Sequence, residues 1–441
     1  MTMMTCSFWA VALVALVALA PVAIRADCPG TPNLRPIYSS DPVLVKSIEN
    51  ASLYHVGTGE NGTTLRVLHL YGSPYAMGYA QGQLLADDIK TMVAAFFEYL
   101  DDTIAPYINW LPQDVQKIIL EDGPAAALQF EVDLTMPYIS QYFLDEIRGL
   151  ADGCNCGIDY KTVLQVHLFP ELIKASCSMF GAWGPAIANV SGTVNQLRAL
   201  DWGLDNPLVN YSLVAVYHPE EGLGHPFASV TFNGFIGSIT SYGGLVGMSE
   251  KVWLSYNESA SRAGVPFHFL MRDAAQFDRT IDDTLNRIYN SKRTCSVHLG
   301  VGSSLDKQFR AVEYSHEEVL VYDDKNYPSY LPAHPLFDGL VFINKHVQPS
   351  SDTCMGSLMT KYYGSLDAET TIRNVLGNTA SGDMHAAFYD YGNNVIHVSV
   401  AGLPVANDGN GTVIDGPMAP AHARPWFRLD MEKLFAQTQA Q

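Results

Sequence analysis

Two different spacings of hydrophobic residues divide this chain. Over residues 83–100 apolar side chains recur at intervals of three and four with charged residues between them, which is the pattern of an amphipathic helix packed on a core. Residues 134–150 repeat the pattern and end at a glycine-bearing stretch. We therefore predict that the chain up to about Cys156 is mostly helical, after an early hairpin around residues 67–71.

After Cys177 the apolar residues fall into short runs that alternate as strands do. Helical spacing returns only over residues 266–289. The predicted strands span residues 195–202, 211–218, 226–232, 245–253, 309–322, 340–345, 384–389 and 395–400. Strands, then helices, then strands predict an α+β fold: a four-layer αββα sandwich of two sheets between helix layers, preceded by a helical N-terminal segment.

Composition supports one large globular domain. The 441 residues are 48% hydrophobic and 16% charged, and the chain shows no linker-like composition break and no repeat. The formal net charge is −19, and Lys and Arg form no clusters. Nucleic-acid binding is therefore excluded, because neutralising phosphates requires such clusters.

The first residues contain an apolar run that fits either a signal peptide or a membrane anchor. The run is short and rich in alanine, and small residues follow it, so we predict a signal peptide over residues 1–26 although no Lys or Arg precedes the run. No later stretch is long enough to cross a bilayer, so no integral membrane span is expected. Six Asn-x-Ser/Thr sequons support a secreted or lysosomal glycoprotein: Asn50, Asn61, Asn189, Asn210, Asn257 and Asn410.

Cysteines and motifs narrow the chemistry. Six cysteines remain outside the signal peptide, and if one is a free nucleophile, at most two disulfides form and one thiol is left over. Cys154, Cys156 and His167 suggest zinc ligands, but no second ligand pair has the required spacing, so we expect no metal and no cofactor. The motifs of serine hydrolases, zinc proteases and nucleotide-binding loops are all absent from the sequence.

The most informative stretch is residues 174–206. Cys177 is followed by Ser178, and Arg198 and Asp201 close the next predicted strand before Trp202 and Gly203. This stretch resembles the cysteine N-terminal-nucleophile hydrolases, the family of acid ceramidase, penicillin acyltransferase-type amidases and bile salt hydrolase. Further matches to that family are residues 72–82 (GSPYAMGYAQG), 145–153 (DEIRGLADG), 342–346 (FINKH) and the hairpin at 387–400. Two departures are Ala199, where the family usually has Asn, and a longer loop after Cys177.

The resemblance implies self-cleavage between Ser176 and Cys177 into two chains that stay associated, residues 27–176 and the catalytic residues 177–441. Cys177 is then both nucleophile and, through its new α-amine, the base, because that amine has an intrinsic pKa of about 7.7 to 8.0. Arg198 and Asp201 hold and orient these groups, and Asn344 donates to the oxyanion. The resemblance also implies a disulfide between Cys28 and Cys354.

Each assignment has a plainer alternative. A lone Cys before Ser in a secreted protein is more often half of a disulfide, and Arg198 and Asp201, three apart on a strand, face opposite sides by simple alternation. Glu250 and Asn233 near glycine-rich loops are expected to be solvated. The aromatic residues near the site fit either an apolar substrate or core packing: Phe180, Trp183, Trp202, Phe232, Phe235, Tyr242 and Trp253.

The function expected from these residues is an autoprocessed cysteine amidohydrolase acting on a small-molecule or lipid N-acyl amide, ceramide-like lipids included. Alternatives on the same fold are an acyltransferase and a phospholipase B-like acyl hydrolase. The alternative of another class is a catalytically silent secreted glycoprotein.

Overall fold

The computed structural model describes residues 28–58, 64–103, 113–172, 175–188, 193–256, 261–403 and 418–439. The predicted signal peptide and the sequons at Asn61, Asn189, Asn257 and Asn410 lie outside the described residues. Of the remaining sequons, Asn210 is exposed and Asn50 is half-buried. No helix in the described ranges has the length and apolar character needed to cross a membrane.

Two sheets form the centre of the molecule. The seven-stranded sheet has the order β1-β17-β16-β15-β6-β5-β14, with strands Ile37–Tyr38 (β1), Ser176–Trp183 (β5), Val194–Asp201 (β6), Leu340–Ile343 (β14), His385–Asp390 (β15), Val395–Val400 (β16) and Trp426–Asp430 (β17). The ten-stranded sheet has the order β13-β12-β11-β10-β9-β8-β7-β4-β3-β2, with strands Val43–Ile48 (β2), Ala51–Gly57 (β3), Thr64–Gly72 (β4), Ser212–Pro219 (β7), Phe227–Phe232 (β8), Thr240–Tyr242 (β9), Val246–Val252 (β10), Ser296–Ser303 (β11), Gln308–Ser315 (β12) and Val319–Tyr322 (β13).

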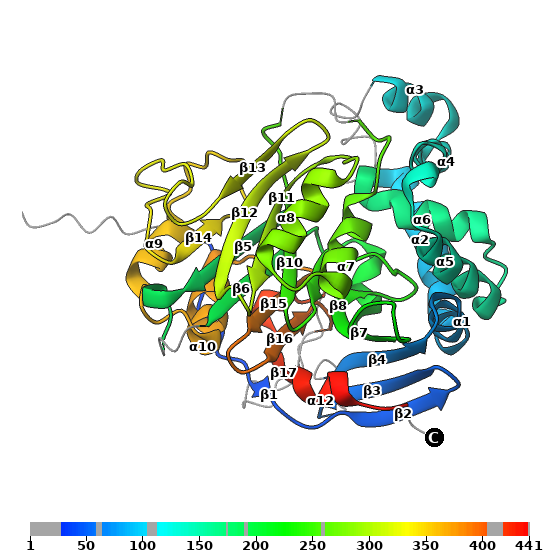
Figure 1. Ribbon diagram of the computed structural model, residues 1–441, viewed down its shortest axis with the longest axis horizontal. Helices are drawn as coiled ribbons and strands as arrows, with labels where there is room; N and C mark the ends of the chain where they lie inside the picture. The colour runs from blue at the N-terminus through cyan, green and yellow to red at the C-terminus, as the bar shows by residue number, and fades with distance from the viewer. Residues whose placement is uncertain are drawn as a thin grey trace, which may run out of the picture.

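Helices cover the outer faces of both sheets (Figure 1). The helices of the N-terminal part are Pro74–Leu84 (α1), Ala86–Thr103 (α2), Gln113–Asp122 (α3), Pro124–Thr135 (α4), Gln141–Cys154 (α5) and Tyr160–Leu172 (α6). The later helices are Phe267–Phe277 (α7), Ile281–Asn290 (α8), Cys354–Tyr362 (α9), Ala368–Thr370 (α10), Gly377–Thr379 (α11) and Met431–Ala436 (α12). A π-helical segment at Thr371–Leu376 joins α10 to α11.

Three hydrophobic cores define the layers. Met179 and Val214 belong to the core between the two sheets. Phe180 packs with Met359 of α9 on the outer face of the seven-stranded sheet, and Met248 packs with Met271 of α7 on the outer face of the ten-stranded sheet. The predicted α+β class and αββα order are confirmed.

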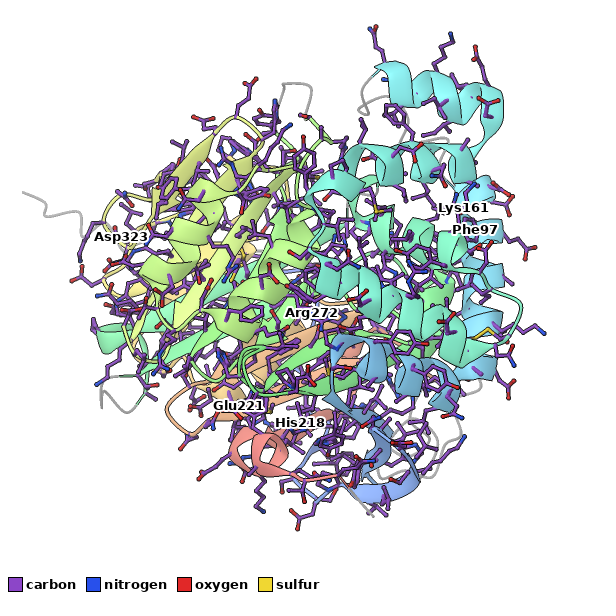
Figure 2. The ribbon with its side chains drawn as sticks, turned by 45° about the vertical axis from the view of Figure 1, so that its right-hand side comes forward. Phe97, Lys161, His218, Glu221, Arg272 and Asp323 are labelled. Atoms are coloured by element: carbon purple, nitrogen blue, oxygen red, sulfur yellow. A yellow bond between two sulfur atoms is a disulfide. The ribbon has the colours of Figure 1, made fainter. Side chains whose placement is uncertain are left out.

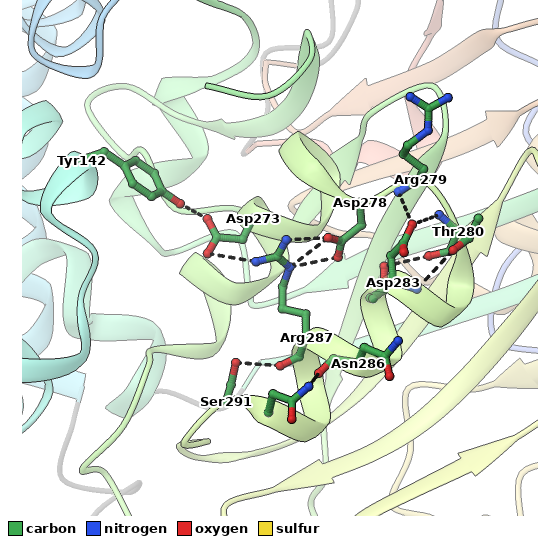
Figure 3. A network of polar contacts seen from close by, with 11 residues as sticks. Tyr142, Asp273, Asp278, Arg279, Thr280, Asp283, Asn286, Arg287 and Ser291 are labelled. Carbon is green, nitrogen blue, oxygen red and sulfur yellow. Dashed lines mark hydrogen bonds and ion pairs between the residues drawn. The ribbon is translucent and has the colours of Figure 1, made fainter. Parts of the chain in front are cut away.

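Hydrophobic spacing did not reveal the breaks inside the predicted helices. Residues 134–150 contain the end of α4 and the start of α5, with Pro137 between them, whose ring nitrogen has no hydrogen to donate to a helix. Residues 266–289 divide into α7 and α8, where the Thr280 side chain caps α8 by accepting from the Asp283 N–H. Arg287 of α8 then donates from Nε to Asp278 just after α7 (2.9 Å), as Figure 3 shows.

Glycines bring α1 and α5 into backbone contact. The two glycine-containing segments that resemble the hydrolase family, residues 72–82 and 145–153, are these two helices. A Cβ at Gly149 would lie 2.2 Å from the carbonyl oxygen of Tyr75, closer than any side chain can approach. Hence these segments have a structural role: their glycines let α1 and α5 pack in backbone contact.

We expect Gly149→Ala to lower the free energy of unfolding by about 1 to 3 kcal/mol, because the added methyl forces α1 and α5 apart. Urea unfolding followed by circular dichroism measures this. Gln141→Ala, an exposed change on the same helix, should stay within about 0.5 kcal/mol of the wild type. Equal stabilities of the two variants would contradict the close crossing.

Contacts join the parts of the chain before and after Cys177. Strand β4 runs parallel to β7, with Val67 opposite Val214. Arg272 of α7 donates to both carboxylate oxygens of Glu146 of α5 at 3.0 and 2.6 Å, and both side chains are fully buried. Arg272 lies between the N-terminal helices and the sheets in Figure 2. The structure also contains a disulfide between Cys28 and Cys354, so these two parts are held together across the predicted cleavage point.

Candidate active site

Cys177 lies at the start of β5, where the seven-stranded sheet meets the N-terminal helices. Its side chain is fully buried, and its Sγ lies 3.9 Å from Glu250 Oε1 and 4.0 Å from the Ala175 carbonyl oxygen. Cys177 and Cys295 are the cysteines among the described residues that form no disulfide. The alternative that Cys177 is half of a disulfide is therefore wrong in this structure.

Arg198 of β6 lies on the same side of the sheet as Cys177. It donates from Nη2 to Glu250 Oε1 (3.0 Å) and from Nη1 to the Ala199 carbonyl (2.8 Å). Its guanidinium is fully buried, and its Nε reaches the Ile239 carbonyl at 3.3 Å, just before the short strand β9. A planar group with several fixed donors is suited to hold both a carboxylate and a thiolate.

Asp201 lies on the opposite face of the sheet from Arg198, as strand alternation requires. Its carboxylate accepts from Ser381 Oγ (2.6 Å) and from the Gly382 N–H (2.9 Å), and Ser381 Oγ is 2.7 Å from Ser178 Oγ. In the β5–β6 register Asp201 is opposite Ser176. Arg198 and Asp201 are therefore not neighbours on one face, yet Asp201 is level with the predicted cleavage bond.

Asn344 directly follows β14, in which Ile343 pairs with Met179 of β5. Its side chain is buried within its own loop: Nδ2 donates to Ser350 Oγ (3.2 Å), and Oδ1 accepts from Gln348 Nε2 (2.7 Å). The next residue, Lys345, donates to the Ala380 carbonyl (2.7 Å) beside Ser381. The register brings Asn344 to the end of β5 that carries Cys177. The role of Asn344 at the oxyanion stays a prediction.

Two buried charged residues of β10 belong to the site: Lys251, which the sequence did not suggest, and Glu250, which was expected to lie in solvent. Glu250 is 3% exposed and Lys251 is fully buried, so the expectation that Glu250 is solvated is wrong. Asn233 is also buried and bonds to Asp88 (2.8 Å), so the same expectation fails there. The sequence did contain a signal for buried charges: two adjacent charged residues lie inside a run of otherwise apolar or small residues, VGMSEKV.

An apolar cavity of about 30 Å³ adjoins Glu250. Its walls are Phe169, Pro170, Ala175, Leu200, Trp202, Phe232, Phe235, Ile239, Val252 and Phe267. This volume holds a water molecule or two and is far below the several hundred Å³ of a ligand pocket. Of the aromatic residues suggested by the sequence, Trp202, Phe232 and Phe235 line the cavity, whereas Phe180 and Tyr242 pack in cores.

The thiol of Cys177 is protonated in the uncut chain. Burial raises its pKa well above the usual value, and the charges of Glu250 and Asp201 raise it further. Arg198 and Lys251 oppose this effect with their positive charges. A protonated, desolvated thiol is a weak nucleophile, so the site needs a group that removes the proton.

The structure gives no arrangement for a metal. Among the described residues, no group of three or more His, Cys, Asp and Glu side chains is placed to hold a metal ion. Cys154 and Cys156 are joined to each other in a disulfide. His167 accepts from the Ile236 N–H at 3.0 Å through Nε2 and contacts the Val163 carbonyl through Nδ1.

Two proteins of Dictyostelium discoideum match nearly the whole chain. Protein dcd1A is 42% identical over 431 residues, which cover 94% of this chain and 95% of dcd1A. The chain belongs to the dcd1 family. Protein dcd1B is 40% identical over 415 residues, covering 91% of this chain and 81% of dcd1B. No protein-family model matches the chain.

Solved structures resemble this dcd1-family chain over part of its length. An N-acylethanolamine-hydrolyzing acid amidase (NAAA) ortholog from Caenorhabditis elegans is 13% identical with a TM-score of 0.36, covering 49% of this chain and 93% of its own. Penicillin V acylase from Agrobacterium tumefaciens is 11% identical with a TM-score of 0.38, covering 60% and 90%.

The pKa of Asp201 predicts a pH dependence of stability. Burial raises it from 3.8 to about 6, although the charge of Lys345 and the Ser381 hydrogen bond oppose this. The folded state therefore binds the proton more tightly, so the stabilisation is complete below pH 3.8 and is lost as the pH rises to about 6.

We expect this loss, about 1 to 3 kcal/mol, to disappear in Asp201→Asn. Urea unfolding between about pH 4 and pH 7 measures it, with Cys177→Ala present in both proteins so that the chain stays intact. The double variant should lose less stability over this range than Cys177→Ala alone. Parallel curves would show that Asp201 has an ordinary pKa.

Proposed function

We propose that this chain is an N-terminal-nucleophile amidase that cleaves itself between Ser176 and Cys177. The observation that carries the proposal is the position of Cys177. This buried cysteine forms no disulfide, is the second residue of a strand, and has the Arg198–Glu250 ion pair beside its thiol. A structural cysteine needs no buried ion pair beside it. Burying such a pair costs free energy, which favours a role in chemistry.

Cleavage supplies the missing base. The new α-amine of Cys177 has an intrinsic pKa of about 7.7 to 8.0 and forms beside the thiol. The register that pairs Asp201 with Ser176 supports Asp201 as the group that accepts a hydrogen bond from that amine. The amine takes the thiol proton, and the thiolate attacks the substrate carbonyl to form an acyl-enzyme that water hydrolyses.

Donors for the oxyanion come from the seven-stranded sheet. Asn344 at the end of β14 has one amide hydrogen bonded to Ser350 and a second amide hydrogen to offer. A single donor of this kind contributes about 3 to 4 kcal/mol to transition-state stabilisation. Arg198 holds the thiolate between turnovers by a charge-assisted hydrogen bond.

The cavity beside Glu250 is too small in this structure to hold an acyl chain, but the apolar character of its walls supports an apolar acyl group in the substrate. Phe169 and Pro170, two of its wall residues, lie on α6 in the predicted N-terminal chain, while Trp202 and Phe267 follow the cleavage point. The substrate class we propose is an N-acyl amide with an apolar acyl chain, such as an N-acyl lipid amide. Two disulfides support folding in the secretory pathway, followed by secretion or delivery to lysosomes.

The test begins with the purified full-length chain incubated at acid and neutral pH. A reducing denaturing gel and N-terminal sequencing should show a new chain that begins at Cys177. The processed protein should then release fatty acid from a panel of ceramides, N-acylethanolamines and acyl amino acids faster than from phospholipids. A chain that remains whole at both pH values, and releases nothing, would instead identify a silent glycoprotein.

A further inference from the structure

We propose that Lys251 takes the thiol proton of Cys177 during self-cleavage, the step that precedes the existence of the α-amine. This inference rests on the proposed function and assigns a residue to its first reaction. The uncut chain has an amide, not an amine, at Cys177, and an amide nitrogen cannot serve as a base. Some other group near the thiol must therefore accept the proton.

The position of Lys251 follows from strand alternation. Ser249 of β10 contacts Met179 of β5 across the space between the sheets, with its Oγ 3.4 Å from Sδ. Lys251 is two residues beyond Ser249, and Cys177 is two residues before Met179. Residues two apart share a face of a strand, so Lys251 points into the same inter-sheet space as Ser249. The adjacent Glu250 reaches Cys177 Sγ at 3.9 Å, which shows that this end of β10 lies beside the thiol.

Within the described ranges, the Lys251 amine forms no salt bridge with a carboxylate. Among the described residues its one hydrogen bond goes to the neighbouring Val252 carbonyl (3.3 Å). Burial lowers its pKa from 10.5 to about 8, against the charges of Cys177, Glu250 and Asp201. His298 lies opposite Lys251 on β11. Burial, and then the charge of Lys251, keep the pKa of His298 well below 6.5.

Glu250 is a weaker base for this step. Burial raises the pKa of its carboxyl, and the positive charges of Arg198 and Lys251 oppose this rise. Its Oε1 already accepts a hydrogen bond from Arg198 at 3.0 Å, so this oxygen is less available to take a proton. A neutral amine with a pKa of about 8 is the stronger proton acceptor beside a thiol whose pKa is raised. Matching the base to the operating pH favours the amine.

The reaction balances with one water and no other reactant. Lys251 Nζ takes the Sγ proton, and the thiolate attacks the Ser176 carbonyl carbon. As the C–N bond breaks, the leaving nitrogen takes the proton from Lys251 and becomes the α-amine of Cys177. The thioester between Ser176 and Cys177 is then hydrolysed by water, which leaves a carboxylate on Ser176 and restores the thiol.

The test compares cleavage rates of wild type, Lys251→Met and Lys251→Arg. Each chain is made with a radioactive label in an oxidising cell-free extract and then diluted into buffers from about pH 5 to pH 10. We expect the wild-type rate to rise with pH through about 8, as the free amine forms. Methionine has no basic group and arginine stays protonated, so both variants should cleave about 100- to 10,000-fold more slowly and lack this inflection.

Ser249→Ala is the matched control, because it alters the same strand face without removing a base, and it should cleave like the wild type. Replacing a buried unpaired ammonium by methionine should not lower the thermal unfolding temperature, which separates a chemical defect from misfolding. If either variant cleaves within about threefold of the wild-type rate with the same inflection, the inference is wrong and the proposed function stands. A wild-type chain that never cleaves overturns the proposed function itself.

Discussion

Cys177→Ala should leave the chain as a single intact polypeptide and remove all release of acyl product. The variant lacks the atom that attacks both the Ser176 carbonyl and the substrate, and loss of a covalent nucleophile costs on the order of a 10⁶-fold decrease in rate. A reducing denaturing gel after incubation at acid and neutral pH measures the first effect. Acid release from a fatty-acyl amide measures the second.

Cys295→Ala provides the control for this experiment. Cys295 is the other buried cysteine of the described chain that forms no disulfide, and it packs in the core with α7 and α8 rather than at the site. We expect this variant to process and turn over normally. Cleavage that persists in Cys177→Ala, or that fails equally in Cys295→Ala, would rule out Cys177 as the specific nucleophile.

Arg198→Met should slow both self-cleavage and turnover at least about 100-fold and should also destabilise the fold. The change leaves the Glu250 carboxylate buried beside Cys177 without its partner. Removing one member of a buried ion pair costs about 3 to 5 kcal/mol, and the unpaired negative charge raises the pKa of the thiol. Urea unfolding in the Cys177→Ala background gives the stability, and the gel assay gives the rate.

The double variant Arg198→Met/Glu250→Gln separates these two effects. Neutralising Glu250 removes the buried unpaired charge, so most of the lost stability should return. Catalysis should stay low, because the guanidinium that donates hydrogen bonds beside the thiolate is gone. Recovery of both quantities together would mean that the pair has a purely structural role.

The position of Glu250 shows that one charge pair connects the two sheets at the site. Arg198 belongs to the seven-stranded sheet and Glu250 to the ten-stranded sheet. A change in the packing of either sheet would therefore alter the environment of the Cys177 thiol. We therefore expect the proposed self-cleavage to require correct assembly of both layers.

The sequence by itself predicted most of the helical and strand segments and identified the residues with candidate chemistry. Alternating apolar residues identified β6, β7 and β10, and the order of helical and alternating segments predicted the αββα layers. The family resemblance added Cys177, Arg198, Asp201 and Asn344 as candidates. These signals are local, because they depend on periodicity or on residues close together in the chain.

Only the tertiary structure decided which of these residues meet. Glu250 and Lys251 are 73 and 74 residues after Cys177 in the sequence. A local sequence pattern cannot reveal a contact between residues so far apart in the chain. Strand alternation placed Asp201 on the opposite face from Arg198, and register placed it level with Ser176. The sequence supplied the chemical groups of the site, whereas the packing of one sheet on the other decided their partners and their protonation.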